Sequence, residues 1–318
     1  MNMNKQNRWI GFVLVLLGAS FWGIGGTVAQ RLFQESHVPV EWLVSVRLLL
    51  AGIVMIILAL LFKTREKVFQ IWKDKQAVFQ LFIFGIFGML AVQYTYMASI
   101  NLGNAAVATL LQYQAPLFII FYLVLTKVSK LRGKDIVAVC LALSGSLLLL
   151  TNGVFHTLSV PLASVIWGIL SGVALAFYTL YAGNLLSKWG SLNIIGWAMI
   201  IGGASLAILH PPWKIEATHW GGDTIIYLGF VIVFGTMLAF WFYLESLKYL
   251  KPQETSLLGS VEPLAAIITS VLWLNISFGF YQVIGTVFIL AMVLYLSLTK
   301  EKETVSTPQV IIKHKKLS

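Results

Sequence analysis

Charged side chains are scarce in this sequence. Asp, Glu, Lys and Arg make up 11% of its 318 residues, whereas hydrophobic residues make up 58% and the mean hydropathy is +0.86. A soluble globular domain has about 25% charged residues. The shortage excludes a chain that lies entirely in water, and it predicts an integral membrane protein.

The sequence also lacks the residues of several kinds of catalytic or cofactor site. Cys140 is its only cysteine, which excludes an intramolecular disulfide and a cysteine-based metal site. None of the five His residues pairs with another at metal-ligand spacing inside a hydrophobic run, and the sequence contains no phosphate-binding P-loop. We therefore expect no metal, no cofactor and no enzyme activity.

Long hydrophobic runs dominate what is present. Each is close to the roughly 20 residues that a helix needs to cross the hydrocarbon core. The first run follows Lys5 and Arg8, as in a signal peptide, but it exceeds the usual apolar core of about 7–15 residues, so we expect a retained helix. The runs predict an all-α integral membrane protein with ten transmembrane helices, at residues 9–30, 41–62, 78–99, 104–126, 134–151, 162–184, 192–209, 224–247, 253–274 and 279–299.

The basic residues are distributed unevenly between the two sides of such a bundle. Nineteen Lys and Arg residues lie on the side of the N-terminus, only Arg31 and Lys214 lie on the other, and Arg47 lies within a run. The positive-inside rule then predicts a multi-pass protein of the inner (plasma) membrane with both termini in the cytoplasm. Because these charges sit in short connections, the net charge of +10 does not indicate a nucleic-acid partner. Residues 300–318 are polar and are predicted to form a disordered cytoplasmic tail.

The sequence repeats itself at a constant offset of 147 positions. The matching pairs are Phe87-Gly88 with Phe234-Gly235, Tyr96 with Tyr243, Leu110-Leu111 with Leu257-Leu258, and Pro116-Leu117 with Pro263-Leu264. We predict a first five-helix repeat at 9–151 and a second at 162–299. Because five is odd, the repeats face opposite ways across the membrane, as in secondary transporters with a central cavity between inverted repeats.

This order of motifs resembles the drug/metabolite transporter superfamily, EamA family, over residues 9–299. The matching features are Trp22-Gly23 in the first helix, Arg47 in the second, Leu110–Pro116 in the fourth, Val261-Glu262-Pro263 in the ninth, and Gln282-x-x-Gly285 in the tenth. Family members often carry Gly-Glu after the fourth and ninth helices. Here those places read Leu125-Thr126-Lys127 and Leu274-Asn275-Ile276, so no role of that Glu is transferred.

The resemblance implies a secondary transporter of small polar metabolites, often amino acids or related compounds, and frequently an exporter. Import of the same solutes is the alternative within transport. A membrane enzyme acting on lipid substrates and a non-transporting membrane sensor are alternatives of other classes. The expected partners are a small solute, a coupled proton and membrane lipid, and a homodimer is left open.

Glu262 is the first candidate for substrate binding. It lies about eight residues into the ninth helix, roughly 12 Å deep at 1.5 Å per residue. An ionisable group at this depth usually faces a protein interior or a cavity, where it can bind a cation or a proton. The following Pro263 leaves the carbonyl of Gly259 without its usual donor. The structural alternative is a protonated Glu262 that is hydrogen-bonded to a neighbouring helix.

Arg47 is the second candidate, because its guanidinium could hold a substrate carboxylate through two hydrogen bonds. The structural alternatives are a side chain that extends to the membrane surface, or an ion pair with Glu41 or Glu35. Glu245 lies three residues before Lys248, a spacing that favours an ordinary ion pair on a helix.

Uncharged polar and aromatic residues recur in the middle of several runs. Their hydrogen-bonding groups are costly to expose to lipid, so we expect them to point inward and to line a substrate cavity. The alternative is that they join helices to one another. The remaining candidate substrate-binding residues are Trp22, Gln93, Tyr96, Gln112, Gln114, Tyr178 and Tyr181.

Overall fold

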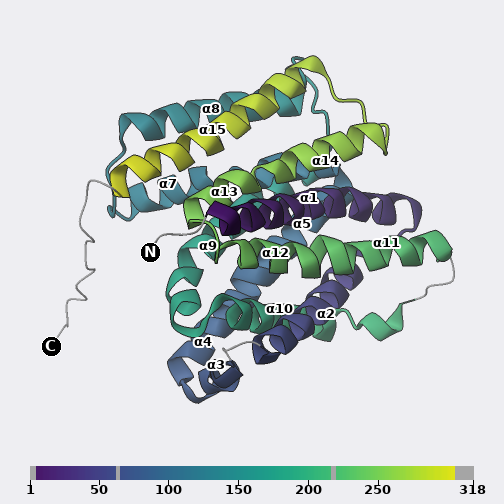
Figure 1. Cartoon of the computed structure of the whole chain (residues 1–318). Coiled ribbons are helices and arrows are strands. Elements are labelled where there is room, and N and C mark those ends of the chain that lie inside the picture. The colour runs from purple at the N-terminus through teal and green to yellow at the C-terminus, as the bar shows by residue number, and fades with distance from the viewer. Residues whose placement is uncertain (1–4, 62–64, 216–219, 305–318) are drawn as a thin grey trace.

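The computed structural model describes residues 5–61, 65–215 and 220–304, and this part of the chain contains helices and no strands (Figure 1). The α-helices are α1 Lys5–Glu35, α2 Val40–Leu61, α3 Arg65–Gln70, α4 Lys75–Ile83, α5 Ala91–Leu102, α6 Ala105–Gln112, α7 Ala115–Leu125, α8 Gly133–Thr151, α9 Leu162–Trp189, α10 Ser191–Leu209, α11 Gly222–Ile232, α12 Ala239–Ser246, α13 Pro252–Gly259, α14 Val261–Leu272 and α15 Phe280–Thr304. Short 3₁₀ segments occupy Ile71–Lys73 and Pro212–Lys214.

The predicted number of transmembrane helices is confirmed, since ten helical stretches are long and apolar enough to cross a membrane. Their ends differ from the expected ones by a few residues. The ten spans are Arg8–Glu35, Val40–Leu61, Lys75–Leu102, Ala105–Leu125, Gly133–Thr151, Leu162–Trp189, Ser191–Leu209, Gly222–Ser246, Glu254–Leu272 and Phe280–Thr299. The last helix continues to Thr304, so the beginning of the expected tail is helical. Residues 305–318 of that tail lie outside the described residues.

Local sequence explains several helix ends. Asp74 caps α4 by accepting hydrogen bonds from the backbone N–H groups of Gln76 and Ala77, each at 3.1 Å. Asn104 caps α6 in the same way, accepting from Val107 at 2.9 Å. Asn152 ends α8 in the left-handed conformation, with φ of 47°, which Asn tolerates better than most residues.

Four spans are not regular α-helices. The third contains a π-helical segment at Phe84–Leu90, and the eighth contains another at Val233–Leu238. The fourth is interrupted between α6 and α7, and the ninth between α13 and α14. In both cases the helix that follows the break has a proline in its first turn. Irregular backbone in the middle of a span is found where the backbone faces protein or a cavity rather than lipid.

The helices pack in pairs that join distant parts of the sequence. α2 packs against α10, α8 against α15, α5 against α9, and α1 against both α12 and α14. Figure 1 shows α8 and α15 side by side at one edge of the bundle, with α1 in its middle. It also shows α1 beginning and α15 ending on the same side, as an even number of spans requires.

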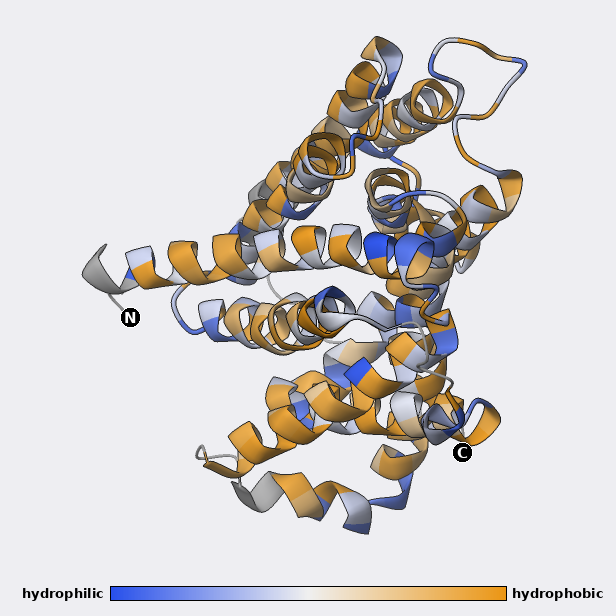
Figure 2. Ribbon diagram, turned by 90° about the vertical axis from the view of Figure 1, so that its right-hand side faces the viewer, coloured by the Kyte–Doolittle hydropathy of each residue, from blue (hydrophilic) through white to orange (hydrophobic). Residues whose placement is uncertain are grey.

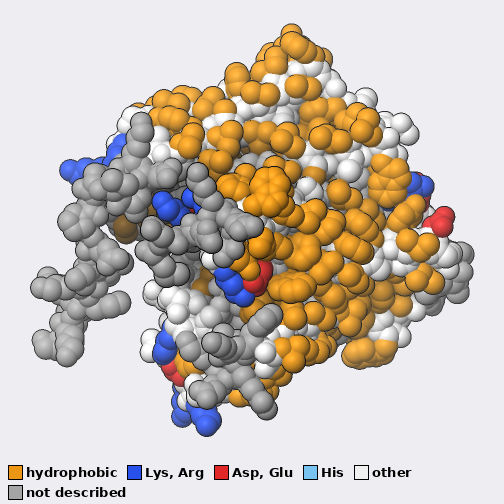
Figure 3. Space-filling view, viewed as in Figure 1, with side chains coloured by type: hydrophobic (Ala, Val, Ile, Leu, Met, Phe, Trp, Pro, Cys, Tyr) orange, Lys and Arg blue, Asp and Glu red, His pale blue; other side chains and the backbone are white. Residues whose placement is uncertain are grey.

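The outer surface of the bundle is hydrophobic. Large apolar side chains such as Leu143 and Ile225 are more than half exposed, which in water would be costly and in lipid is favourable. Figure 3 shows hydrophobic side chains covering the middle of one face, with most charged side chains toward the side where α1 begins. Figure 2 shows hydrophilic residues mainly at helix ends and in connections. The surface is therefore suited to a bilayer.

Candidate substrate cavity

A cavity of about 860 Å³ lies in the middle of the bundle. Its size is typical of a site for a small molecule. It is lined from α1, α2, α5, α8, α9, α10, α12 and α15 and from the interrupted fourth and ninth spans. Seven of the nine candidate residues line it: Trp22, Arg47, Gln93, Tyr96, Gln112, Tyr178 and Glu262.

Arg47 is held inside the bundle rather than extending to the membrane surface, and the described residues show no ion pair between it and Glu41 or Glu35. Its side chain is only 3% exposed, and it donates a hydrogen bond to the side-chain oxygen of Gln93. Glu41 instead accepts a hydrogen bond from Tyr94 at 3.0 Å, and Glu35 pairs with another arginine. The Nε of Arg47 has no partner among the described residues. A buried N–H of this kind is costly unless a ligand or water satisfies it.

Glu262 faces the same cavity from the first turn of α14. Its Oε2 lies 3.0 Å from the hydroxyl oxygen of Tyr113, which comes from the break between α6 and α7. The same hydroxyl lies 2.8 Å from the carbonyl oxygen of Gly259. The carboxyl group therefore has a partner on a neighbouring helix, and it is also accessible to a solute in the cavity.

Aromatic rings form much of the cavity wall. The ring of Trp22 lies 4.9 Å from that of Phe240 and 5.1 Å from that of Tyr243. Tyr178 packs against Phe84 at 4.8 Å, and the hydroxyl of Tyr96 lies 2.8 Å from the Oγ1 of Thr109. Such rings bury the apolar part of a solute, and their faces attract a cationic group.

Two candidate residues are not part of the cavity lining. Gln114 donates from its amide to the hydroxyl of Ser146, and so joins the fourth span to α8. Tyr181 stacks on Phe177 at 5.1 Å on the same helix. The expected ion pair of Glu245 is confirmed, because its carboxylate lies 2.7 Å from the Nζ of Lys248.

Two aromatic residues of the site, Tyr243 and Tyr113, were not among the predicted binding residues. Tyr243 was not among the candidates, although it is the counterpart of Tyr96 at the offset of 147. Tyr113 is adjacent to Gln112, but nothing in the sequence indicates that its hydroxyl reaches across to α13 and α14. The repeat in the sequence could therefore have identified Tyr243, but not Tyr113.

One end of the cavity reaches the connections between spans. Lys130 and Arg132 line it between α7 and α8, Ser191 lines it at the start of α10, and Pro252 lines it at the start of α13. All of these belong to the side of the bundle where the N-terminal helix begins. The cavity therefore extends toward this side of the bundle.

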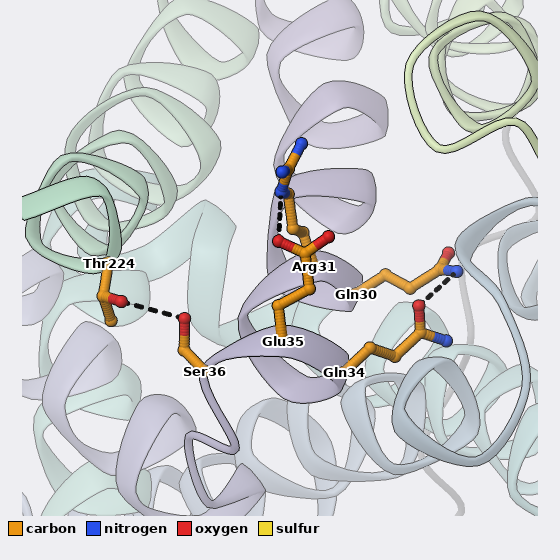
Figure 4. Close-up of polar contacts among 6 residues, drawn as sticks. All are labelled: Gln30, Arg31, Gln34, Glu35, Ser36 and Thr224. Carbon is orange, nitrogen blue, oxygen red and sulfur yellow. Dashed lines mark hydrogen bonds and ion pairs between the residues drawn. The ribbon is translucent and has the colours of Figure 1, made fainter. Parts of the chain in front are cut away.

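At the opposite end, polar side chains at the end of α1 and just after it form hydrogen bonds and an ion pair (Figure 4). Arg31 pairs with Glu35 at 2.6 Å, and Ser36 lies 2.9 Å from Thr224 between their hydroxyl oxygens. The guanidinium carbon of Arg31 also lies 5.4 Å from the ring centre of Tyr227 and 5.0 Å from that of Trp273. These contacts join α1 to α11 and to the end of α14.

The fold defines a multi-pass membrane protein with a cavity among its helices. The model of the EamA-like transporter family matches residues 9–151 and again residues 162–298. The chain therefore belongs to this family, and it is a membrane transporter.

Two of the three similar proteins described next are named as transporters. The chain is 34% identical over 294 residues to the uncharacterized inner membrane transporter YicL of Salmonella typhimurium, covering 92% of this chain and 96% of that protein. An uncharacterized transporter of Archaeoglobus fulgidus is 25% identical over 85% of this chain and 90% of its own. The protein PecM of Dickeya dadantii is 28% identical over 77% and 78%.

A solved crystal structure has the same fold. It superposes with a TM-score of 0.61 and covers 94% of this chain and 99% of its own, at 16% sequence identity. At this identity the likeness concerns the arrangement of the helices and carries no information on the solute.

Proposed function

We propose that the protein is a secondary transporter that exports amino acids or related small amphipathic metabolites by alternating access. The observation that carries this proposal is the presence of Arg47 and Glu262 in one aromatic-walled cavity. Tyr96 lines the same cavity as both. A solute with a carboxylate and an ammonium group would pair with both side chains, and its apolar part would lie against the rings.

The packing of the helices supports two repeats related by a pseudo-two-fold axis. Exchange of the repeats converts the first span into the sixth, the third into the eighth, and the fourth into the ninth. α1 packs on the eighth and ninth spans, and α9 packs on the third and fourth, as this exchange requires. The π-helical segments and the helix breaks also fall in corresponding spans. Rocking of such repeats against each other is the usual route to alternating access.

The orientation follows from the charges around the open end of the cavity. The connections there include Lys130 and Arg132, so the positive-inside rule makes this end cytoplasmic. The structure then corresponds to an inward-open state of an inner-membrane protein with both termini in the cytoplasm. Reporter fusions at the N-terminus, at Lys130 and after Lys300 should all report cytoplasm, and a fusion at His156 should report the outside. Termini on opposite sides of the membrane would contradict the orientation.

Glu262 supplies a site for a coupled proton as well as for a cationic group, because a carboxyl group in a cavity can exchange one for the other. The same geometry permits import if the ion or solute gradient is reversed, so import is the second candidate. Homodimerisation stays a prediction, and a mass measurement of the purified protein in detergent tests it.

Transport in liposomes tests the proposal. Purified protein would be reconstituted and supplied with labelled amino acids, and exchange would be followed for wild type, Glu262→Gln and Glu245→Gln. The Glu262→Gln variant keeps the shape of the side chain and removes its charge, so we expect exchange to collapse. Glu245→Gln is the matched control, because it removes a carboxylate that pairs with Lys248. Unchanged exchange in Glu262→Gln would exclude the proposed role.

A further inference from the structure

Tyr113 lies between two acceptors that compete for one hydrogen atom. Its hydroxyl oxygen is 2.8 Å from the carbonyl oxygen of Gly259 and 3.0 Å from the Oε2 of Glu262. A tyrosine hydroxyl has a single hydrogen to donate. Tyr113 belongs to the broken fourth span, and both acceptors flank the break in the ninth. The hydroxyl therefore connects the two interrupted helices.

The carbonyl of Gly259 needs a donor from outside its own helix. In a regular helix it would accept from the backbone N–H four residues later. That residue is Pro263, which has no N–H. The hydroxyl of Tyr113 takes the place of the missing donor, at ordinary hydrogen-bond length.

The charge state of Glu262 decides which acceptor receives the hydroxyl hydrogen of Tyr113. An ionised carboxylate only accepts, and it attracts the hydroxyl hydrogen more strongly than a neutral carbonyl does. A protonated Glu262 carries its own hydrogen and donates it to the oxygen of Tyr113, which leaves the tyrosine hydrogen for Gly259. The proton enters from water at the open end of the cavity and returns to water when Glu262 ionises again, and no other bond changes.

Few charged or titratable groups surround this arrangement in the described part of the chain. Tyr96 on α5, Tyr243 on α12 and Arg47 on α2 line the same cavity as Glu262 and Tyr113. The described arginines of α1 are engaged elsewhere, Arg8 with Glu254 and Arg31 with Glu35. Glu262 is the one carboxylate in this group.

We infer that Tyr113 is a positioning residue that transmits the protonation of Glu262 to the backbone at the break in the ninth span. Protonation completes a series of hydrogen bonds from Glu262 through Tyr113 to Gly259, and these bonds connect the fourth span to the ninth. When Glu262 ionises, the hydroxyl hydrogen of Tyr113 moves away from the carbonyl of Gly259, and the connection between the two spans weakens. The inference rests on the proposed function, because it assigns to the same site the step that couples a proton to helix movement.

A distance measurement tests this without knowledge of the solute. Spin labels would be placed on cysteines at Lys127, after α7, and Lys251, before α13, in a protein lacking Cys140. Both sites are exposed. We expect the distance distribution of wild type to change between acidic and alkaline pH. The measured quantity is the ratio of the populations at the two distances, and its change with pH should be roughly tenfold smaller in Tyr113→Phe than in wild type, as for loss of a hydrogen bond to a charged group.

Two further variants separate coupling from a merely structural effect. Pro263→Ala gives Gly259 an intrahelical donor, so it should flatten the pH response while Tyr113 and Glu262 are both intact. Tyr94→Phe is the matched control, because it removes a tyrosine–glutamate hydrogen bond of the same 3.0 Å length outside the cavity. It should keep the wild-type response.

A wild type without a pH response, or a wild-type response in both Tyr113→Phe and Pro263→Ala, would overturn the inference. This failure is distinct from failure of the proposed function, which is decided by exchange in liposomes containing Glu262→Gln. Loss of exchange in Glu262→Gln together with an unaltered pH response in Tyr113→Phe and Pro263→Ala would leave the transporter and remove the coupling role of Tyr113.

Discussion

The guanidinium carbon of Arg31 lies 5.0 Å from the centre of the Trp273 ring, and this contact holds the end of α1 against the end of α14. Arg31 is one of only two basic residues expected on the outer side. It is also the one that packs against two aromatic rings, since Tyr227 lies on its other side at 5.4 Å. The contact lies at the end of the bundle opposite the open end of the cavity.

Arg31→Ala should therefore make the cavity more accessible from outside. Each cation–π contact contributes about 0.5–2 kcal/mol, so loss of two should shift the balance of states by roughly fivefold or more. The measurement is labelling of a cysteine at Gln93 by an impermeant thiol reagent in intact cells, in a background lacking Cys140. Lys214→Ala is the control, because it removes the other, exposed outer cation. Equal labelling of the two variants would show that the contacts of Arg31 do not restrict access to the cavity from outside.

Arg47 should contribute to the recognition of a substrate carboxylate. Arg47→Lys keeps the charge but removes the planar pair of donors, so the apparent affinity for amino acids should fall about tenfold to a hundredfold, as for a lost charge-assisted hydrogen bond. Affinity for an analogue that lacks the carboxylate should change little. Substrate titration of exchange in liposomes measures both, with Lys248→Gln as the control for loss of a surface cation. A uniform loss for both solutes would argue for a structural role.

Gly25 should not tolerate a side chain. A Cβ at this position would lie 2.8 Å from the Cα of Gly235, where α1 crosses the π-helical segment of the eighth span. Overpacking of this kind typically costs about 1–3 kcal/mol, so Gly25→Ala should lower the melting temperature in detergent. Gly229→Ala is the matched control, because a Cβ there meets nothing within 4 Å. Equal melting temperatures for the two variants would refute the close crossing.

Asp74 should stabilise the start of α4 in a pH-dependent way. The pKa of its carboxyl is lowered, mainly by the hydrogen bond from Lys188 at 2.8 Å and then by the backbone N–H of Ala77. Because the folded pKa is the lower one, the stabilisation is present above the ordinary pKa of Asp, 3.8, and is lost as the pH falls through the folded pKa. Asp74→Ala should lower the melting temperature at neutral pH more than Lys188→Ala, which leaves the helix cap. The difference in melting temperature between the two variants should disappear at acidic pH.

Much of the fold was accessible from the sequence because hydrophobicity is a property of each segment by itself. A run of about 20 apolar residues must cross the bilayer or be buried whatever its neighbours are. The ten spans were predicted on this ground and are confirmed. The pair of Glu245 with Lys248 was also predicted correctly, because both partners lie on one helix and its geometry sets their separation.

The partners of Arg47 could not be predicted in this way. The sequence offers Glu41 and Glu35 nearby, yet the structure places Gln93 of another span against the guanidinium. Gln114 likewise bonds to Ser146 of α8 rather than lining the cavity. Which side chains meet across two helices depends on how each helix is rotated about its axis, and a run that is hydrophobic all round leaves that rotation undetermined.

The sequence by itself determined the spans, the uneven distribution of basic residues and the presence of Glu262 and Arg47 within the membrane. Only the tertiary structure decided that these two face one cavity, that the cavity opens at one end, and that Tyr113 reaches both Glu262 and Gly259. The physical reason is that hydrophobic burial acts on whole segments without direction, whereas hydrogen bonds and ring contacts require particular atoms to meet. Such meetings arise only when helices distant in the sequence have packed together.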